Sequence, residues 1–419
     1  TALDVTVQAQ ILTLLSELQQ EMNTAVLLIT HDMGVVAATC DRVLVMRDGE
    51  QRESGELEQI FYAPQDAYTR DLLAAVPRLD TAGQPEPGTG TATATGAQPL
   101  LRVADLKVQF RVDAPGLLQR AKRLRAVDGV SLQLQRGETL GVVGESGCGK
   151  STLARGILQL IENEYGQVVF LSQALEDIDA SALKQLRSKM QLIFQDPLAS
   201  LNPRMTVGDI VAEPLLTFQP DLSRSERLGR VRSLLKRVGL EENHVYRYPH
   251  EFSGGQCQRI GIARALIGEP ELIICDEPVS ALDVSVQAQI VDLLMDLQRE
   301  MGLALIFIAH DLAVVRQISQ RVLVMYLGRV MEIASSAALY DSPRHPYTQA
   351  LISAVPIPDP RLERSRKRTL LRGDVPSPVD PPSGCVFRTR CPLADDKCAA
   401  ERPELRPVGD SQVACHYAD

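Results

Sequence analysis

The chain has 419 residues, an apolar content of 45% and a formal net charge of −9. This length allows two or three domains, each with a core of its own, and the acidic balance argues against a dedicated nucleic-acid binder. No stretch approaches 18 uncharged apolar residues and no secretory signal is visible, so we expect a cytoplasmic protein without a membrane span.

The first part of the chain is repeated near its end. Residues 1–77 align without a gap on residues 280–356, at a constant offset of 279, and roughly half of the aligned positions are identical. The equivalent pairs include Asp4 and Asp283, His31 and His310, and Pro77 and Pro356. An ungapped register of that length indicates a duplicated domain. We therefore interpret residues 1–79 as the C-terminal part of a first copy.

Three further segments follow the first copy. Residues 80–99 offer few apolar side chains to bury, which predicts a mobile tether. Residues 100–355 alternate short apolar runs with helix-like stretches, and this pattern predicts a mainly parallel α/β sheet with flanking helices. Within this second copy, residues 181–265 are expected to be mainly helical. From residue 356 to residue 419 the composition shifts to Pro, Arg and Cys, which indicates a separate C-terminal extension.

A glycine-rich loop joins the apolar run of residues 139–143 to a helix-like stretch, residues 152–161. It has the pattern G-x-x-x-x-G-K-S, and its residues are Gly144, Glu145, Ser146, Gly147, Cys148, Gly149, Lys150 and Ser151, followed by Thr152. The glycines allow successive backbone N–H groups to surround a triphosphate, and Lys150 can reach the β- and γ-phosphates. Ser151 offers a hydroxyl to Mg²⁺. The flanking strand and helix favour a nucleoside triphosphate site over a plain tight turn.

A second apolar run, residues 272–275, ends in Asp276 and Glu277. The carboxyl ends of the strands are where ligands bind in open α/β sheets. Asp276 is suited to hold Mg²⁺, and Glu277 is suited to orient or deprotonate the attacking water. Beside a phosphate loop, this interpretation is favoured over a surface turn with solvated acids.

A short polar segment, Ser253, Gly254, Gly255 and Gln256, precedes a helical run at residues 257–266. The free N–H groups and the positive end of such a helix can bind an anion. An ordinary helix N-cap is the alternative interpretation. Because one nucleotide hardly needs two such helix starts in one domain, we infer that this segment faces the nucleotide of a partner domain.

Taken in chain order, these motifs resemble those of the ATP-binding cassette family. The family's order is kept by the phosphate loop, Gln195, the Ser253–Gln256 segment, the Asp276-Glu277 pair, the loop at 280–283 and His310. The resemblance covers nearly the whole chain and implies a P-loop nucleotide-binding domain with a helical insert. The sequence departs from the family at Phe252 and Cys257, where Leu and Gln are common. Neither change removes an N–H donor, so we expect an altered rate rather than a loss of activity.

The resemblance implies a role for each matching position. Glu277, His310 and Gln195 would be catalytic, Lys150 would bind the phosphates, and Mg²⁺ would be held by Ser151, Gln195 and Asp276. Ser253, Gly254, Gly255 and Gln256 would act across a dimer of cassettes, together with Asp283 and its first-copy equivalent Asp4. His31 is the first copy's equivalent of the switch histidine His310. Phe110 lies where the family places an aromatic side chain that stacks on adenine.

The family's sites are composite, since each pairs the phosphate loop of one cassette with the Ser-Gly-Gly-Gln segment of another. Residues 1–79 contain neither of these two elements. We therefore expect the chain by itself to contain no complete catalytic site. Catalysis would need the remainder of a tandem protein or self-association of the second cassette.

The C-terminal extension narrows the resemblance. Residues 199–205 and 373–385 resemble segments of the ATPases that energise bacterial dipeptide and oligopeptide importers. Four cysteines lie in the extension with the spacing C-x5-C-x6-C-x16-C, namely Cys385, Cys391, Cys398 and Cys415. Four thiolates suit either tetrahedral Zn²⁺ or an iron–sulfur cluster. The resemblance favours a [4Fe–4S] cluster, and unligated reduced thiols are the alternative.

The resemblance thus implies an ATP-hydrolysing subunit that powers dipeptide or oligopeptide uptake through ATP-driven cassette dimerisation. It also implies two integral-membrane permease subunits, an extracytoplasmic substrate-binding protein and a peripheral position on the cytoplasmic face of the plasma membrane. Glutathione, haem and nickel chelates remain open as substrates. A soluble tandem ATPase that acts on ribosomes or nucleic acid is the alternative from another class, and the acidic balance and the extension argue against it.

Overall fold

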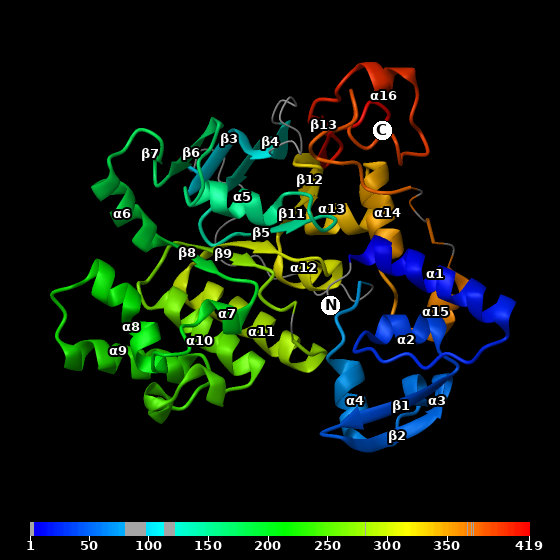
Figure 1. Ribbon diagram of the computed structural model, residues 1–419, viewed down its shortest axis with the longest axis horizontal. Coiled ribbons are helices and arrows are strands. Elements are labelled where there is room, and N and C mark those ends of the chain that lie inside the picture. The colour runs from blue at the N-terminus through cyan, green and yellow to red at the C-terminus, as the bar shows by residue number, and fades with distance from the viewer. Residues whose placement is uncertain are drawn as a thin grey trace, which may run out of the picture.

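A computed structural model of the chain describes residues 4–79, 98–112, 122–280, 282–366, 368, 369, 371 and 373–419. The predicted tether at residues 80–99 lies almost entirely outside these described residues. Among the described residues, no helix is both long and apolar enough to cross a membrane. Figure 1 shows the blue first-copy elements beside the larger body formed by the rest of the chain.

The main sheet has eight strands in the order β13-β14-β12-β11-β5-β10-β9-β8. Its parallel part comprises β8 (Met190–Ile193), β9 (Leu272–Asp276), β10 (Ala304–Ile308), β5 (Thr139–Val143) and β11 (Arg321–Tyr326). Every residue of β5, β9 and β10 is buried, as expected for parallel strands covered on both faces. The predicted α/β fold with a mainly parallel sheet is confirmed.

A second, antiparallel sheet packs above the phosphate-loop helix α5 (Lys150–Ile157). Its order is β4-β3-β6-β7, with β3 (Leu101–Val112), β4 (Lys122–Leu134), β6 (Tyr165–Phe170) and β7 (Gln173–Ala174). The apolar inner face of this sheet shares one core with α5 and with the near face of the main sheet. This core fixes the position of α5 and of the loop that leads into it.

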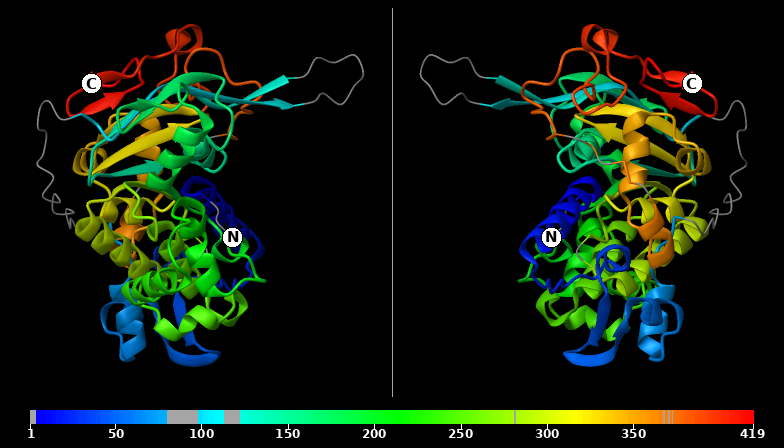
Figure 2. Two further views of the ribbon diagram at one scale, coloured as in Figure 1. Left: turned by 90° about the vertical axis from the view of Figure 1, so that its left-hand side faces the viewer. Right: turned by 90° about the vertical axis from the view of Figure 1, so that its right-hand side faces the viewer.

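The remaining helices of the second copy are α6 (Ala180–Lys189), α7 (Pro197–Ser200), α8 (Val207–Phe218), α9 (Arg224–Arg237), η1 (Glu242–Tyr246), η2 (Pro249–Glu251), α10 (Gly254–Leu266), α11 (Val284–Met301), α12 (Leu312–Ile318), α13 (Ser336–Asp341) and α14 (Pro346–Ala354). The α6 helix packs through Leu186 into the core around α5, and the others lie on the other side of the main sheet (Figures 1 and 2). The segment expected to be mainly helical therefore contains α6 to α10, together with the short strand β8.

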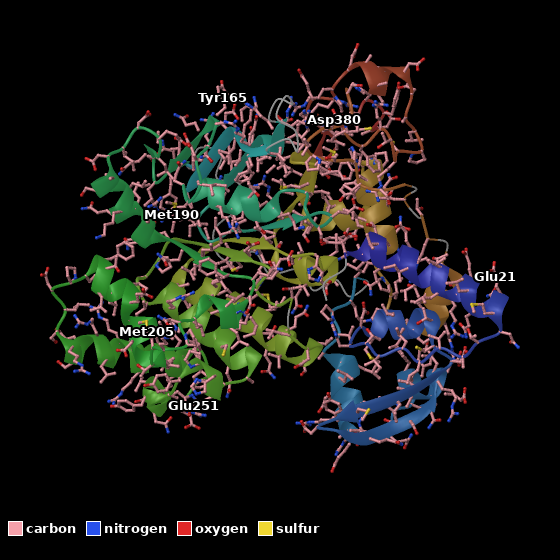
Figure 3. All side chains as sticks on the ribbon, in the orientation of Figure 1. Glu21, Tyr165, Met190, Met205, Glu251 and Asp380 are labelled. Carbon is pink, nitrogen blue, oxygen red and sulfur yellow. The ribbon has the colours of Figure 1, made fainter. Side chains whose placement is uncertain are left out.

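The first copy repeats the elements of the second copy at the offset of 279. Its elements are α1 (Val5–Met22), α2 (Met33–Thr39), β1 (Arg42–Arg47), β2 (Glu50–Glu56), α3 (Leu57–Tyr62) and α4 (Ala67–Ala74), and they match α11, α12, β11, β12, α13 and α14. The β1–β2 hairpin even carries its bulge at the same place as the β11–β12 hairpin. Figure 3 labels Glu21 at the outer end of α1, at the margin of the molecule.

Within the repeated residues 280–356, the strand β10 has no counterpart in the first copy. Residues 24–30, which match β10 and its flanks, form no strand. Leu27 and Ile29 are 91% and 90% exposed, whereas the equivalent Ile306 and Ile308 are at most 1% exposed. In the second copy, β10 lies between β5 and β9. An apolar segment without such neighbours has no ladder to join.

The C-terminal extension packs as part of the cassette. It contains α15 (Pro360–Ser365), α16 (Asp396–Ala400), β13 (Arg406–Val408) and β14 (Ser411–Val413), and β14 pairs with β12 in the main sheet. Phe387 of the extension is buried against Tyr326 and Tyr347, with ring centroids 5.4 and 5.3 Å away. The composition of the extension suggested a separate segment. In the structure, buried apolar side chains of the extension, Phe387 among them, are part of the hydrophobic core of the cassette.

Candidate nucleotide site

The glycine-rich loop leaves the end of β5 and enters α5. Gly144 and Gly149 have φ values of 151° and 105°, which side chains rarely adopt. A Cβ atom on Gly149 would also lie only 2.1 Å from the carbonyl oxygen of Ala126. The Lys150 ammonium donates to the carbonyls of Gly144 and Glu145, at 2.8 and 3.2 Å. The loop is thus a closed turn with its lysine inside.

Asp276 stands at the end of β9, beside the first turn of α5. The Ser151 hydroxyl donates to its carboxylate with an Oγ–Oδ1 distance of 2.8 Å. Burial raises the pKa of Asp276, and the bond from Ser151 opposes this rise. Two of the three side chains that the sequence assigns to Mg²⁺ are therefore already in contact, in a setting where a cation would stabilise the carboxylate.

Glu277 is the point where the other candidate catalytic side chains meet. It adopts a φ of 48°, and its amide donates to the carbonyl of Ile308, which holds it against β10. The Gln195 amide donates to its carboxylate at 2.8 Å, and His310 Nδ1 lies 3.6 Å from the same oxygen. The bond with His310 lowers the pKa of Glu277, although burial opposes the effect. Glu277 is therefore kept as a carboxylate, the form that can accept a proton from water.

The Ser253–Gln256 segment forms the N-terminus of α10. The Ser253 amide donates to the Gln256 side chain at 3.0 Å, and the Gln256 amide donates to the Ser253 hydroxyl at 3.4 Å, which is a capping box. Gly255 packs so tightly on α11 that a Cβ atom there would lie 2.3 Å from Val286. The bonds of these side chains stay within their own helix start, so the segment does not take part in the cluster around Glu277.

The first copy contacts the phosphate loop directly. Asp4 caps α1 through the amide of Val7, and its other carboxylate oxygen accepts from the amide of Ser146 at 3.4 Å. The Thr6 hydroxyl bonds to the side chain of Glu145. Asp283, the second-copy equivalent of Asp4, caps α11 through the amide of Val286 at 3.1 Å. Equivalent residues of the two copies therefore have unlike surroundings.

A cavity of about 640 Å³ lies between the two copies. Equivalent residues line it in pairs, namely Val5 and Val284, Gln8 and Gln287, His31 and His310, Asp32 and Asp311, Val76 and Val355, and Pro77 and Pro356. Gln8 donates to Asp32 and Gln287 donates to Asp311, so the two walls repeat the same contact. This pairing indicates an approximate two-fold relation between the copies, and it brings His31 to the cavity that Glu277 also lines.

The remaining predicted residues occupy varied positions. Phe110 is 42% exposed near the end of β3. Thr152 lies in the first turn of α5 and is half-buried. Cys148 is buried inside the loop, where burial raises the pKa of its thiol. Gly147 has open space where a Cβ would lie.

Three contacts of the phosphate loop were not foreseen from the sequence. They are made by Thr6, Tyr347 and Arg390, and all three partners bind Glu145. A charged residue inside a glycine-rich turn was the only available signal, because a buried carboxylate needs a cation. Sequence patterns do not say which of the chain's many arginines supplies it.

The four cysteines of the extension line one small pocket together with His345 and His416. All of the chain's cysteines are free. Burial raises the pKa of the thiols of Cys385, Cys391 and Cys398, that of Cys391 to about 11. The donor set suits a thiolate-binding metal. However, no three His, Cys, Asp or Glu side chains among the described residues converge closely enough to hold a metal ion.

Comparison with known families agrees with this geometry. The model of the family described as ABC transporter matches residues 127–280, which contain the phosphate loop, the Ser253–Gln256 segment and the Asp276-Glu277 pair. The model described as the oligopeptide/dipeptide transporter, C-terminal region, matches twice, at residues 53–99 and 331–398. The chain belongs to the ABC transporter ATPases. The family predicted from the motifs is confirmed.

Curated proteins similar to this ABC ATPase include oligopeptide and glutathione transport proteins. The oligopeptide transport ATP-binding protein OppF of Salmonella typhimurium is 61% identical over 322 residues, which are 76% of this chain and 96% of the relative. OppF of Escherichia coli is 59% identical, over 78% of this chain and 99% of the relative. The glutathione import ATP-binding protein GsiA of Pectobacterium atrosepticum is 51% identical over 90% of this chain, which spans 63% of that relative.

Solved structures share the cassette fold. The ATP-binding cassette MJ0796, as a post-hydrolysis dimer bound to ADP and Pi, has a TM-score of 0.51 and 30% identity over 56% of this chain and 98% of its own. CbiO1 of Clostridium perfringens has a TM-score of 0.51 and 28% identity, over 59% of this chain and 92% of its own. The ABC ATPase therefore has one cassette-sized unit of known fold, and additional chain.

Proposed function

We propose that this chain is the ATP-hydrolysing subunit that powers dipeptide or oligopeptide uptake by an ABC importer. The main support for the proposal is that the nucleotide-site residues and the transporter-type extension contact the same loop. Ser151, Asp276 and Glu277 lie together at the carboxyl edge of the main sheet, and the extension matched by the oligopeptide/dipeptide model packs against the same loop. High identity to proteins named for oligopeptide transport supports the substrate class.

In this proposal, the second copy binds ATP through the loop at residues 144–151, with Lys150 on the phosphates. Ser151, Gln195 and Asp276 would hold Mg²⁺, whose charge would offset the negative charge of the phosphates. Glu277 orients and deprotonates water, and His310 holds its carboxylate. The 2.8 Å bonds of Ser151 to Asp276 and of Gln195 to Glu277 support this division of roles.

The nucleotide site would be completed by another cassette. Ser253 and Gly254 begin α10 at the surface. The side-chain bonds of this segment stay within the helix start, so the segment does not belong to the cluster around Glu277 in its own domain. Asp4 lies at the phosphate loop, which supports a cross-copy role for the loop before α1. We infer a tandem organisation with residues 1–79 as part of a first cassette, 80–99 as linker, 100–355 as second cassette and 356–419 as extension.

The partners would be two integral-membrane permease subunits, with an extracytoplasmic binding protein that delivers substrate to them. The ATPase would lie peripherally on the cytoplasmic face of the plasma membrane. ATP binding would close two cassettes, and hydrolysis would reopen them, so that the permease changes its orientation. The match of the extension to a transporter family model argues against the alternative of a soluble ATPase that acts on ribosomes or nucleic acid.

A second substrate, glutathione, is favoured by one observation. The match to GsiA covers 90% of this chain, whereas the matches to OppF cover 76% and 78%. A match over 90% of the chain includes part of the first copy as well as the second. This wider coverage supports glutathione as a second substrate, although sequence identity is higher to the oligopeptide transporters.

Uptake by cells that carry the full transporter tests the function. Radiolabelled dipeptide, pentapeptide and glutathione would be offered to cells with the wild-type subunit and to cells with Glu277→Gln. We expect peptide uptake that the variant abolishes while its abundance and membrane association stay unchanged. Uptake of glutathione alone would favour the second substrate, and uptake of all three without dependence on Glu277 would refute the ATPase role.

We further propose that the four cysteines of the extension hold an iron–sulfur cluster, with Zn²⁺ as the alternative metal. The four thiols line one pocket, which supports this proposal. Among the described residues no three such side chains are close enough to hold a metal ion, so the thiols would have to move together on binding. Iron, sulfide and zinc would be measured on anaerobically purified protein and on Cys385→Ser. Metal-free wild-type protein in which all four thiols of the extension react with a thiol reagent would show that these cysteines are unligated.

A further inference from the structure

Glu145 is the most heavily bonded residue of the phosphate loop. Its amide donates to the Tyr347 hydroxyl at 3.0 Å. Its carbonyl accepts from the amide of Cys148 and from the Lys150 ammonium, both at 3.2 Å. Its carboxylate is 1% exposed and binds Arg390. Every polar group of this residue is therefore used, and two of its bonds hold the loop and its lysine.

The partner of the carboxylate comes from the C-terminal extension. Arg390 binds Glu145 through both terminal nitrogens, with Nη1–Oε2 and Nη2–Oε1 distances of 2.6 and 3.0 Å. Such a fork-to-fork pair fixes the plane of the carboxylate as well as its position. The Arg390 side chain is 3% exposed, so the pair is shielded from water and from salt.

The surroundings of Arg390 hold it rigidly. Its guanidinium lies over the ring of Tyr326, 5.9 Å from the centroid, and its amide donates to the carbonyl of Phe387 at 3.0 Å. Phe387 is fully buried between Tyr326 and Tyr347. The aromatic cluster therefore anchors the turn of the extension and, through Tyr347, the amide of Glu145. Because Arg390 directly precedes Cys391, the pair also joins the loop to the pocket of four thiols.

We propose that Arg390 is a positioning residue for ATP binding: it clamps Glu145 so that the phosphate loop and Lys150 are preformed, which makes the extension a structural part of the nucleotide site. A preformed loop loses less conformational freedom when ATP binds than one that must first order. Removing the clamp should therefore weaken ATP affinity more than it slows the chemical step. By linkage, bound ATP should in turn order the extension.

The test is calorimetric titration of the full chain with MgATP. For Arg390→Met we expect the dissociation constant to rise about tenfold, which corresponds to about 1.4 kcal/mol. Arg368→Met is the matched control, because Arg368 pairs with the buried Glu363 in the same extension away from the phosphate loop. The control should lose comparable stability while its dissociation constant stays within twofold of wild type.

A second variant covers the case in which Arg390→Met fails to fold. Glu145→Gln combined with Arg390→Met leaves no unpaired buried charge. We expect this double variant to fold and to bind ATP about tenfold more weakly, with no further loss beyond either single change. Wild-type affinity in the double variant, or in a folded Arg390→Met, would overturn the proposal.

Hydrogen exchange supplies an independent readout. In wild type, MgATP should slow exchange of the amides at residues 385–391, and in the double variant it should not. Lys150→Ala distinguishes a failure of the proposed nucleotide site from a failure of the role proposed for Arg390. If Lys150→Ala binds ATP normally, the phosphate-loop site itself is wrong; if it loses ATP while Arg390→Met does not, only the role of Arg390 is wrong.

Discussion

At the scale of single residues, the site depends on side chains that meet only in the fold. Gln195, Glu277 and His310 lie in three separate parts of the sequence, yet Glu277 contacts both of the others. Since β9 and β10 are parallel neighbours, the residues that follow them emerge at one edge of the sheet. The sequence therefore predicts that Glu277 and His310 lie near each other. It does not predict the distance between their side chains.

The first residue-scale prediction concerns Glu277. Glu277→Gln keeps the size and the bond to Gln195 but cannot accept a proton. We expect ATP hydrolysis by the assembled transporter to fall by about 10²–10⁴-fold, while MgATP binding is retained. Steady-state phosphate release and nucleotide binding check this. Glu300→Gln, an exposed change in the last turn of α11 where Glu300 pairs with Arg237, should leave both unchanged, and equal losses in the two variants would contradict the role of Glu277.

The second residue-scale prediction concerns the loop glycines. Gly149→Ala forces a Cβ against the carbonyl oxygen of Ala126 at a φ of 105°. Gly147→Ala, at a φ of 76°, meets no atom within 4 Å. We expect Gly147→Ala to cost about 1–2 kcal/mol of unfolding free energy, from backbone strain alone, and Gly149→Ala to cost more and to abolish ATP binding. Urea denaturation of both variants tests the order, and equal losses would show that the loop adapts.

At the scale of elements, the two copies show the same helix start made with different residues. His345 caps α14 through the amide of Tyr347 at 3.0 Å, and at the equivalent place Asp66 caps α4 through the amides of Tyr68 and Thr69. Both residues provide an acceptor for free N–H groups at a helix N-terminus. The difference follows from burial, since His345 is 1% exposed and a charged carboxylate would be costly there.

The element-scale prediction is a pH dependence of stability. Burial lowers the pKa of His345 to about 4, from its usual 6.5. Between these values the unfolded chain binds a proton that the folded chain does not, so the unfolding free energy falls as the pH drops from about 6.5 to about 4, by about 3 kcal/mol in total. His345→Asn keeps an acceptor for the cap and does not titrate.

We therefore expect His345→Asn to flatten that part of the stability profile. Urea denaturation at intervals between pH 4 and pH 7 measures it, with His250→Asn as the control. His250 is exposed in η2, away from the four thiols, and its replacement should leave the slope unchanged. An identical slope in wild type and His345→Asn would show that His345 is not the group that titrates.

At the scale of the whole molecule, the first copy is held by the second. Asp4 and Thr6 reach the phosphate loop, and α1 packs on α14 while α2 and α3 pack on α15. Figure 2 shows these blue elements against the body of the molecule from both sides. The first copy's own apolar cluster is small and centres on Met33, Val36 and Leu57. Its stability should thus depend on contacts with the second copy and with the extension, to which α15 belongs.

The whole-molecule prediction compares equivalent backbone segments of the two copies. Residues 24–30 form no ladder, whereas residues 304–308 are a central strand. We expect hydrogen exchange with an opening free energy near zero at 24–30 and close to that of global unfolding at 304–308. Mass spectrometry of the isolated chain measures both segments in one experiment. Strong protection at residues 24–30 would contradict the view that this segment lacks sheet neighbours.

Features that depend on local pattern could be predicted from the order of the residues. Alternating apolar runs specify the mainly parallel sheet, the glycines around Lys150 specify a phosphate loop, and the ungapped offset of 279 specifies the recurrence of helices and strands. These follow from short-range chemistry: periodicity, turn conformation and residue type at fixed spacing. The order of motifs was sufficient to identify the ABC family.

Which distant residues share a site became clear from the folded chain alone. Composition suggested that the extension was separate, yet β14 extends the main sheet and Arg390 binds Glu145, 245 positions earlier in the chain. The same apolar pattern forms a strand at 304–308 and none at 25–29, because a strand needs neighbours to accept its hydrogen bonds. Pairing across such separations depends on packing and burial, which no local pattern encodes.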